Sequence, residues 1–170
     1  NVAAATEIYT LSCCVAVPLF SVPVVYASSS AVYGNFPICN DKKEKFSITS
    51  PYAQDKLTVE YHAKTLFEVF NIPSVGLRLF NVYGPGQKNN FVISKYIELA
   101  SKNKNLKVYG RGNQTRSFCH VDDATEGVIE VIENGKKNTI YNIGNNQEPI
   151  SIHNLAKLVA SIFKSNIKYD

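Results

Sequence analysis

The sequence predicts an α/β fold built on a mainly parallel sheet, and three observations support this prediction. Predicted strands alternate with predicted helices along most of the chain, which is the pattern of parallel βαβ units. Residues 23–28 form a short apolar run without charge, as expected for a strand that is covered on both faces. The run ends in a hydroxyl side chain at Ser28, with further hydroxyls at Ser29 and Ser30, and α/β sheets bind ligands at the carboxyl ends of their strands. A serine-rich turn that only caps the strand remains the alternative.

The central part of the chain gives clear local signals. Ser50 is a suitable N-cap and Pro51 suits the first helical position, so a helix is predicted over residues 51–70. A strand is predicted over residues 74–80 because they are mostly apolar and end at turn residues. Residues 81–87 are rich in glycine and proline, which predicts a loop.

The second half of the chain continues the alternation. Asp123 and Glu126 have capping-box spacing, which predicts a helix from there to about residue 133. Ser151 is the expected cap of the last helix. A helix is predicted over residues 91–102, a strand over 106–109 and a turn-rich segment over 110–115. A further strand is predicted over residues 139–143, and the last helix over 152–163.

Composition restricts the classes of function. The chain has 170 residues, 45% of them hydrophobic, and a formal net charge of +4, so a packed core is expected and disorder is not. The basic residues are spread out rather than gathered in a stripe with aromatics, which argues against nucleic-acid binding. The four cysteines (Cys13, Cys14, Cys39 and Cys119) lack zinc-ligand spacing. We expect no metal site, and reduced thiols in a cytoplasmic protein.

One segment requires a membrane test. Residues 8–40 contain no charge, and residues 8–27 are long enough to span a bilayer. Pro18, Pro23 and the absence of a basic flank argue against a spanning helix. A helix followed by a buried strand is therefore the preferred interpretation, and a membrane-anchored interaction protein is a minor alternative.

A tyrosine and a lysine on the predicted helix suggest acid–base chemistry. Tyr52 and Lys56 are four residues apart, so they share one face of a helix and can meet a common ligand. An ammonium group beside a phenol favours the phenolate, which is then a usable proton acceptor. A solvated surface pair is the alternative for these two residues alone.

Together, the serine-ended strand, the Tyr52–Lys56 pair and the segment LRLFNVYGPG over residues 77–86 resemble the extended short-chain dehydrogenase/reductase family. Within it they are most similar to NAD-dependent nucleotide-sugar epimerases of the UDP-glucose 4-epimerase type. The resemblance implies a partial Rossmann-like, doubly wound sheet in residues 1–85, with a small and incomplete α/β substrate-binding part in residues 86–170. It also implies NAD as cofactor, a UDP-sugar as substrate and a homodimer when full length, with Leu66, Val69 and Phe70 available for the interface.

The resemblance carries residue roles to positions in this sequence. It implies a catalytic triad of Ser29, Tyr52 and Lys56, with Ser30 as the choice if the register is off by one. Tyr52 and Lys56 would also contact the cofactor, with Phe80 against its nicotinamide end. Arg116 would hold the substrate diphosphate and Tyr109 would pack on the base. The full set of implied substrate contacts is Ser29, Ser30, Asn81, Asn90, Phe91, Tyr109 and Arg116.

The implied reaction is epimerisation at carbon 4 of a nucleotide sugar through a transient 4-keto sugar. Dehydratases and decarboxylases of the same family carry acidic residues directly after the active hydroxyl, whereas this chain has Ser30 and Ala31, so epimerisation is favoured. The family's glycine-rich cofactor turn is not found in this sequence. We therefore expect the chain to lack the amino-terminal cofactor-binding half, and a non-catalytic fragment or pseudoenzyme remains an alternative.

Overall fold

The computed structural model describes residues 24–34, 46–147 and 149–169. Its contacts divide the chain into two compact units. The first comprises Asn1–Phe80 and Glu126–Ile143, and the second comprises Asn81–Thr125 and Gly144–Asp170. The chain therefore passes between the units more than once. The assignment of residues 1–85 to a cofactor-binding domain and 86–170 to a substrate-binding part stays a prediction.

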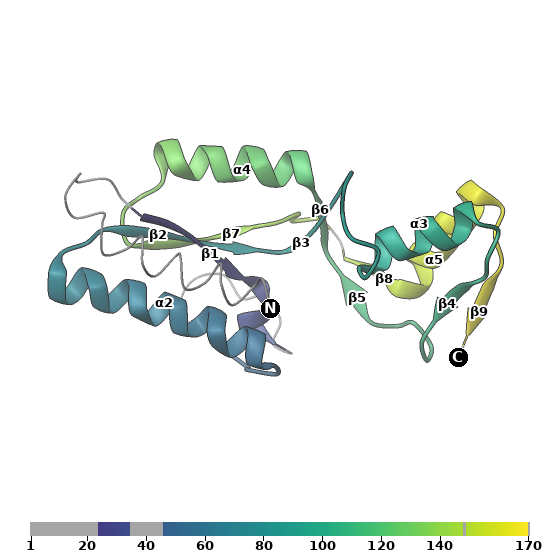
Figure 1. Cartoon of the computed structure of the whole chain (residues 1–170), viewed down its shortest axis with the longest axis horizontal. Coiled ribbons are helices and arrows are strands. Elements are labelled where there is room, and N and C mark those ends of the chain that lie inside the picture. The colour runs from purple at the N-terminus through teal and green to yellow at the C-terminus, as the bar shows by residue number, and fades with distance from the viewer. Residues whose placement is uncertain (1–23, 35–45, 148, 170) are drawn as a thin grey trace. The chain divides into compact units, whose positions relative to one another are not determined.

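Among the described residues, the first unit contains a three-stranded parallel sheet between two helices. The strands lie in the order β1-β2-β7, so β2 is central and pairs with both neighbours. Helix α2 covers one face of the sheet and α4 the other (Figure 1). The bounds are β1 Val24–Ser29, α2 Pro51–Phe70, β2 Ser74–Leu79, α4 Val121–Asn134 and β7 Thr139–Ile143. The predicted α/β fold with parallel strands is confirmed.

Helix α2 begins and ends as its sequence predicts. The Ser50 side chain accepts a hydrogen bond from the Ala53 amide at 3.2 Å, which satisfies one of the free N–H groups of the first turn. Asn71 ends the helix in the left-handed conformation, with φ of 55°. The buried residues of α2 are Ala53, Leu57, Glu60 and Ala63, which form the face that packs on the sheet.

A glycine allows the close packing at the centre of the sheet. A Cβ atom at Gly76 would lie 2.6 Å from the Tyr26 hydroxyl oxygen and 3.0 Å from Cγ1 of Ile140. Only a residue without a side chain lets Tyr26 lie across β2 there. Burial is the main cause that raises the pKa of Tyr26 above its usual range, with a smaller contribution from Glu60.

The second unit combines two helices with three pairs of short strands. Strands β3 and β6 are parallel, β4 and β9 are parallel, and β5 and β8 are antiparallel. Their core includes Tyr96, Leu106, Val108 and Ala156. The bounds are β3 Asn81–Tyr83, α3 Val92–Ser101, β4 Leu106–Val108, β5 Thr115–Arg116, β6 Phe118–His120, β8 Ile150–Ser151, α5 Ile152–Phe163 and β9 Ile167–Tyr169.

Two predictions about these elements are wrong. Asn81–Tyr83 form strand β3, although a loop was predicted there, because they pair with the distant β6. Helix α4 begins at Val121, so Asp123 lies in its first turn and is not its cap. Asp122 and Asp123 still suit this position, since carboxylates stabilise the positive end of the helix dipole.

Over the described ranges, no helix is both long and apolar enough to cross a bilayer. The segment considered from the sequence, residues 8–27, lies outside the described residues as far as residue 23.

Candidate active site

The carboxyl end of β1 presents two serine hydroxyls. Ser29 is the last residue of the strand and caps the short 3-10 helix η2, Ser30–Tyr33. Its side-chain oxygen accepts a hydrogen bond from the Ala31 amide at 3.2 Å. The hydroxyl proton of Ser29 can still be donated to a ligand, because a hydroxyl accepts and donates at once. Ser30 is half-buried one residue later, so the choice between the two serines stays a prediction.

Helix α2 carries the predicted proton-transfer pair. Tyr52 is 52% exposed, and the Lys56 ammonium nitrogen lies 5.6 Å from the centre of its ring. The same nitrogen donates a hydrogen bond to the Ala27 carbonyl at 3.3 Å. Lys56 thus connects this face of α2 to β1 two residues before Ser29.

Phe80 lies at the same edge of the sheet. It directly follows β2, and its amide donates to the carbonyl of Ile143, the last residue of β7, at 3.0 Å. Its ring is 6.4 Å from that of Tyr33 in η2, centre to centre. Since β1, β2 and β7 are parallel, Ser29 and Phe80 both stand at the carboxyl edge, where such sheets bind ligands.

In the second unit, the predicted substrate residue Asn81 bonds to the residue that follows Arg116, another predicted substrate residue. The Asn81 side-chain amide donates to the Ser117 carbonyl at 2.9 Å. Arg116 is the adjacent residue, exposed on β5, and its guanidinium donates to the Thr115 carbonyl at 2.8 Å. Asn81 is also exposed. An exposed guanidinium can bind a phosphate group, so the roles of Asn81 and Arg116 in substrate binding stay predictions.

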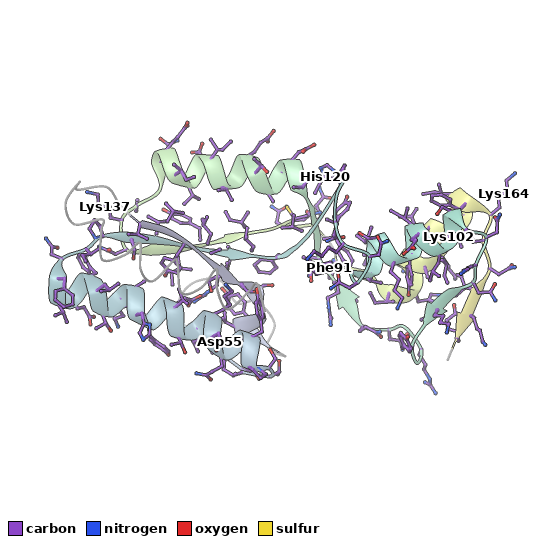
Figure 2. The ribbon with its side chains drawn as sticks, in the orientation of Figure 1. Asp55, Phe91, Lys102, His120, Lys137 and Lys164 are labelled. Atoms are coloured by element: carbon purple, nitrogen blue, oxygen red, sulfur yellow. The ribbon has the colours of Figure 1, made fainter. Side chains whose placement is uncertain are left out.

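The other three predicted substrate residues lie on exposed loops of this unit. Phe91 is 53% exposed and occupies the cap position before α3 without a capping side chain (Figure 2). Asn90 precedes it and is also exposed. Tyr109 is 63% exposed directly after β4. Their roles in substrate binding stay predictions.

A buried charge pair beside the predicted triad was missed by the sequence analysis. The Arg78 guanidinium makes two hydrogen bonds to the Glu60 carboxylate, Nε to Oε1 at 2.8 Å and Nη2 to Oε2 at 2.7 Å. Both side chains are buried, and the Ser28 hydroxyl also donates to Glu60 Oε1. One signal was available, because an arginine inside an apolar strand needs a buried partner. Glu60 lies on the buried side of α2, four residues after Lys56.

A cavity of about 230 Å³ lies against the buried side of α2. Its wall includes Glu60 and Arg78. It extends to Ser74, Asn138 and Thr139, which stand where β2 and β7 begin. This is the end of the sheet opposite Ser29. We therefore do not assign the predicted substrate to this cavity.

Histidine and acidic side chains do not gather into a metal site in the part of the chain that the structure describes. His120, at the end of β6 (Figure 2), lies with its Nδ1 3.4 Å from a carboxylate oxygen of Asp122. It also accepts a hydrogen bond from the Asp122 amide at 3.3 Å. Next to it, burial raises the pKa of the Cys119 thiol.

Comparison with known proteins identifies related enzymes. The family described as the NAD dependent epimerase/dehydratase family matches residues 2–144. The dTDP-D-glucose 4,6-dehydratase of Homo sapiens is 36% identical over 141 residues, which cover 82% of this chain and 40% of the human protein. The chain therefore spans less than half the length of this relative.

Solved structures give the same picture. The UDP-N-acetylglucosamine 4-epimerase of Methanobrevibacter ruminantium, solved with UDP-N-acetylmuramic acid, matches with a TM-score of 0.85 at 30% identity, over 95% of this chain and 54% of its own. The dTDP-glucose 4,6-dehydratase of Bacillus anthracis, solved with NAD, also has a TM-score of 0.85, over 95% of this chain and 53% of its own. At 23% identity the latter supports the fold alone.

Proposed function

The chain belongs to the NAD dependent epimerase/dehydratase family, and from this premise we propose that the full-length protein epimerises a nucleotide sugar at carbon 4. The observation that carries the proposal is the arrangement in the first unit. Lys56, on the same face of α2 as Tyr52, is hydrogen-bonded to β1 two residues before Ser29. A phenol, an ammonium and a hydroxyl in this arrangement can move a proton to and from a sugar hydroxyl.

The residues present fit the ribose and nicotinamide portions of NAD. Tyr52 and Lys56 offer polar hydrogens on one helix face, and Phe80 offers an aromatic ring at the carboxyl edge of the sheet. When bound, NAD supplies reversible hydride acceptance at the sugar carbon. Lys56 is assigned to hold the cofactor ribose and to stabilise the Tyr52 phenolate.

The proton steps then belong to the chain's own residues. The Tyr52 phenolate oxygen takes the proton of the sugar's 4-hydroxyl, and Ser29 donates a hydrogen bond to the oxygen left behind. After the 4-keto sugar has turned over, Tyr52 returns the same proton to that oxygen. The overall reaction is an isomerisation, so no group is gained or lost.

The substrate is assigned to residues of the second unit. Arg116 and Asn81 would hold the diphosphate, because a guanidinium grips phosphate oxygens in bidentate fashion. Tyr109 would pack on the base, with Asn90 and Phe91 as further contacts. All of these side chains are exposed, and the resemblance is what assigns their roles.

Dehydration is the second candidate, since the human relative is a dTDP-D-glucose 4,6-dehydratase. Removal of water from a 4-keto sugar needs a further acid and base beside the triad. The two residues that follow Ser29 are Ser30 and Ala31, and neither is a comparable acid or base at neutral pH. Epimerisation needs no such groups, which is why we prefer it.

One experiment separates the candidates. The full-length protein with NAD is incubated with UDP-glucose and, separately, with dTDP-glucose, and the sugars are followed by NMR. Epimerisation predicts the carbon-4 epimer with carbon 6 unchanged, whereas dehydration predicts a 4-keto sugar whose carbon 6 has become a methyl group. If UDP binds but every nucleotide sugar remains unchanged, the protein is a non-catalytic member of the family.

A further inference from the structure

The Glu60–Arg78 pair belongs to a hydrogen-bond network that runs across strands β1, β2 and β7. In the strand register, Ser28 on β1 pairs with Arg78 on β2, and Arg78 pairs with Asn142 on β7. Ser28 donates to Glu60 from one side. On the other side, Arg78 Nη1 donates to the Tyr33 hydroxyl at 2.7 Å, and that hydroxyl donates to Asn142 Oδ1 at 2.8 Å.

The two charged side chains at the centre of this network are buried. Arg78 is 1% exposed and Glu60 is 6% exposed. The guanidinium also lies 5.0 Å from the centre of the Tyr33 ring and 5.1 Å from that of Phe46. No described side-chain nitrogen or oxygen buried from solvent is left without a hydrogen-bond partner. The pair is therefore fully satisfied, and its geometry is fixed from several directions.

A buried ion pair of this kind is weak support for stability. Desolvation of the two charges offsets most of their attraction, and apolar residues of similar volume are often equally stable or more so. What a bidentate, fully satisfied pair does provide is a defined geometry between the elements that carry it. Here those elements are α2 and β2, with β1 and η2 attached through Ser28 and Tyr33.

Four of the five network residues are close neighbours of a residue assigned to the reaction. Ser28 directly precedes Ser29, and Glu60 lies one helical turn after Lys56 on the same helix. In addition, Tyr33 closes the 3-10 helix that Ser29 caps, and Arg78 lies two residues before Phe80. The network thus joins the segments that present the hydroxyl, the phenol–ammonium pair and the aromatic ring.

We propose that Glu60 and Arg78 are positioning residues: their buried pair sets the spacing between Ser29 on β1 and the Tyr52–Lys56 turn of α2. The expected effect on kcat rests on the proposed function. The expected effect on the spacing between Ser29 and the Tyr52–Lys56 turn does not. Neither residue needs to touch the substrate or the cofactor. Displacement by a fraction of an ångström to one ångström at a reacting group can lower a rate by up to about 10²-fold.

The test uses the full-length protein with NAD and a double variant, Glu60→Leu with Arg78→Met, which replaces the pair by apolar side chains. We expect kcat to fall by about 10- to 100-fold, while KM for the nucleotide sugar and the unfolding temperature change little. A wild-type kcat in this variant, folded at the assay temperature, overturns the proposal. If the double variant fails to fold, a milder pair of variants tests the positioning proposal.

The milder variant is Ser28→Ala, and its matched control is Ser74→Ala. Both serines are buried in the same sheet, but Ser74 lies where β2 begins, at the end away from Ser29. Ser28→Ala is expected to lower kcat several-fold more than Ser74→Ala at equal unfolding temperature. Equal kcat values for the two variants contradict a positioning role.

Crystal structures of the wild type and Ser28→Ala give a readout that does not depend on turnover. The proposal predicts a changed separation between Tyr52 Oη and Ser29 Oγ in the variant, and an unchanged separation overturns it. A wild-type protein that converts no nucleotide sugar contradicts the proposed function but not the positioning role. The separation between Tyr52 Oη and Ser29 Oγ in the two crystal structures then tests the positioning role.

Discussion

The ammonium group of Lys56 donates a hydrogen bond to the carbonyl of Ala27, 3.3 Å away. This contact joins the helix that carries Tyr52 to the strand that ends at Ser29. The same ammonium nitrogen lies 5.6 Å from the centre of the Tyr52 ring, so Lys56 contacts both Tyr52 and the strand that carries Ser29. The following predictions use the full-length protein and test each assigned residue against a matched one.

Lys56→Met should weaken NAD binding more than Lys64→Met. The ammonium assigned to the cofactor ribose is lost in the first variant, and hydrogen bonds to charged groups contribute about 1.5–3 kcal/mol. Lys64 is exposed on the same helix, with its nitrogen 3.7 Å from Glu68, and has no assigned contact with NAD. Calorimetric titration of NAD into the cofactor-free protein measures both affinities. Equal affinities would remove Lys56 from the cofactor site.

Ser29→Ala should lower turnover by about 10²-fold, the usual effect of removing one preorganised donor to a reacting oxygen. It should also cost about 0.5–2 kcal/mol of stability, because the Ala31 amide loses the acceptor that Ser29 provides at 3.2 Å. Ser30→Ala is the comparison variant for the register, with a smaller loss of kcat expected, and kcat together with thermal unfolding reports both effects. If Ser30→Ala gives the kinetic loss instead, the register of the assignment is wrong by one residue.

Arg116→Ala should reduce the free energy of UDP binding by about 1.5–3 kcal/mol, since a charge-assisted contact to the diphosphate is removed. Arg111→Ala is the control, an exposed arginine five residues earlier in the same unit with no assigned role. UDP titration of both variants gives the comparison. Wild-type affinity in Arg116→Ala would move the diphosphate away from this residue.

The full-length protein should be a homodimer that uses the outer side of α2. Phe70 is 66% exposed and Val69 is 64% exposed at the end of this helix, and apolar side chains gathered on a surface often mark an interface. Phe70→Glu should give a monomer by light scattering at micromolar concentration. Ile162→Glu should leave the dimer intact, although Ile162 is 67% exposed on α5. A wild-type monomer contradicts this prediction.

The sequence was sufficient for the elements that local signals define. The capped start of α2 and the apolar strands β1 and β2 could be predicted because Ser50, Pro51 and the residue patterns act locally. Strand β3 could not be predicted, since Asn81–Tyr83 become a strand only by pairing with β6 far along the chain. The start of α4 was misplaced because the capping spacing of Asp123 occurs within the helix rather than at its end.

In the predicted site too, local signals could be read from the sequence and long-range contacts could not. Tyr52 and Lys56 could be chosen from their spacing on one helix face, and Ser29 from its place after a strand and from the family pattern. Glu60 could not be predicted as part of the site, because its partner Arg78 lies on another element and the sequence gives no sign that the two side chains meet. A glutamate on a helix is usually solvated, and only the fold shows that this one is buried.

Replacement of Tyr52 tests the central claim most directly. Tyr52→Phe removes only the ionisable hydroxyl from a half-exposed ring, so thermal unfolding and UDP binding should match the wild type. The matched control is Tyr61→Phe, a tyrosine that is 57% exposed on the same helix, compared with 52% for Tyr52. Our account predicts that nucleotide-sugar turnover falls by about 10²–10⁴-fold in Tyr52→Phe and stays at the wild-type level in Tyr61→Phe. A fully active Tyr52→Phe enzyme would contradict it, since proton transfer would then have to take place elsewhere.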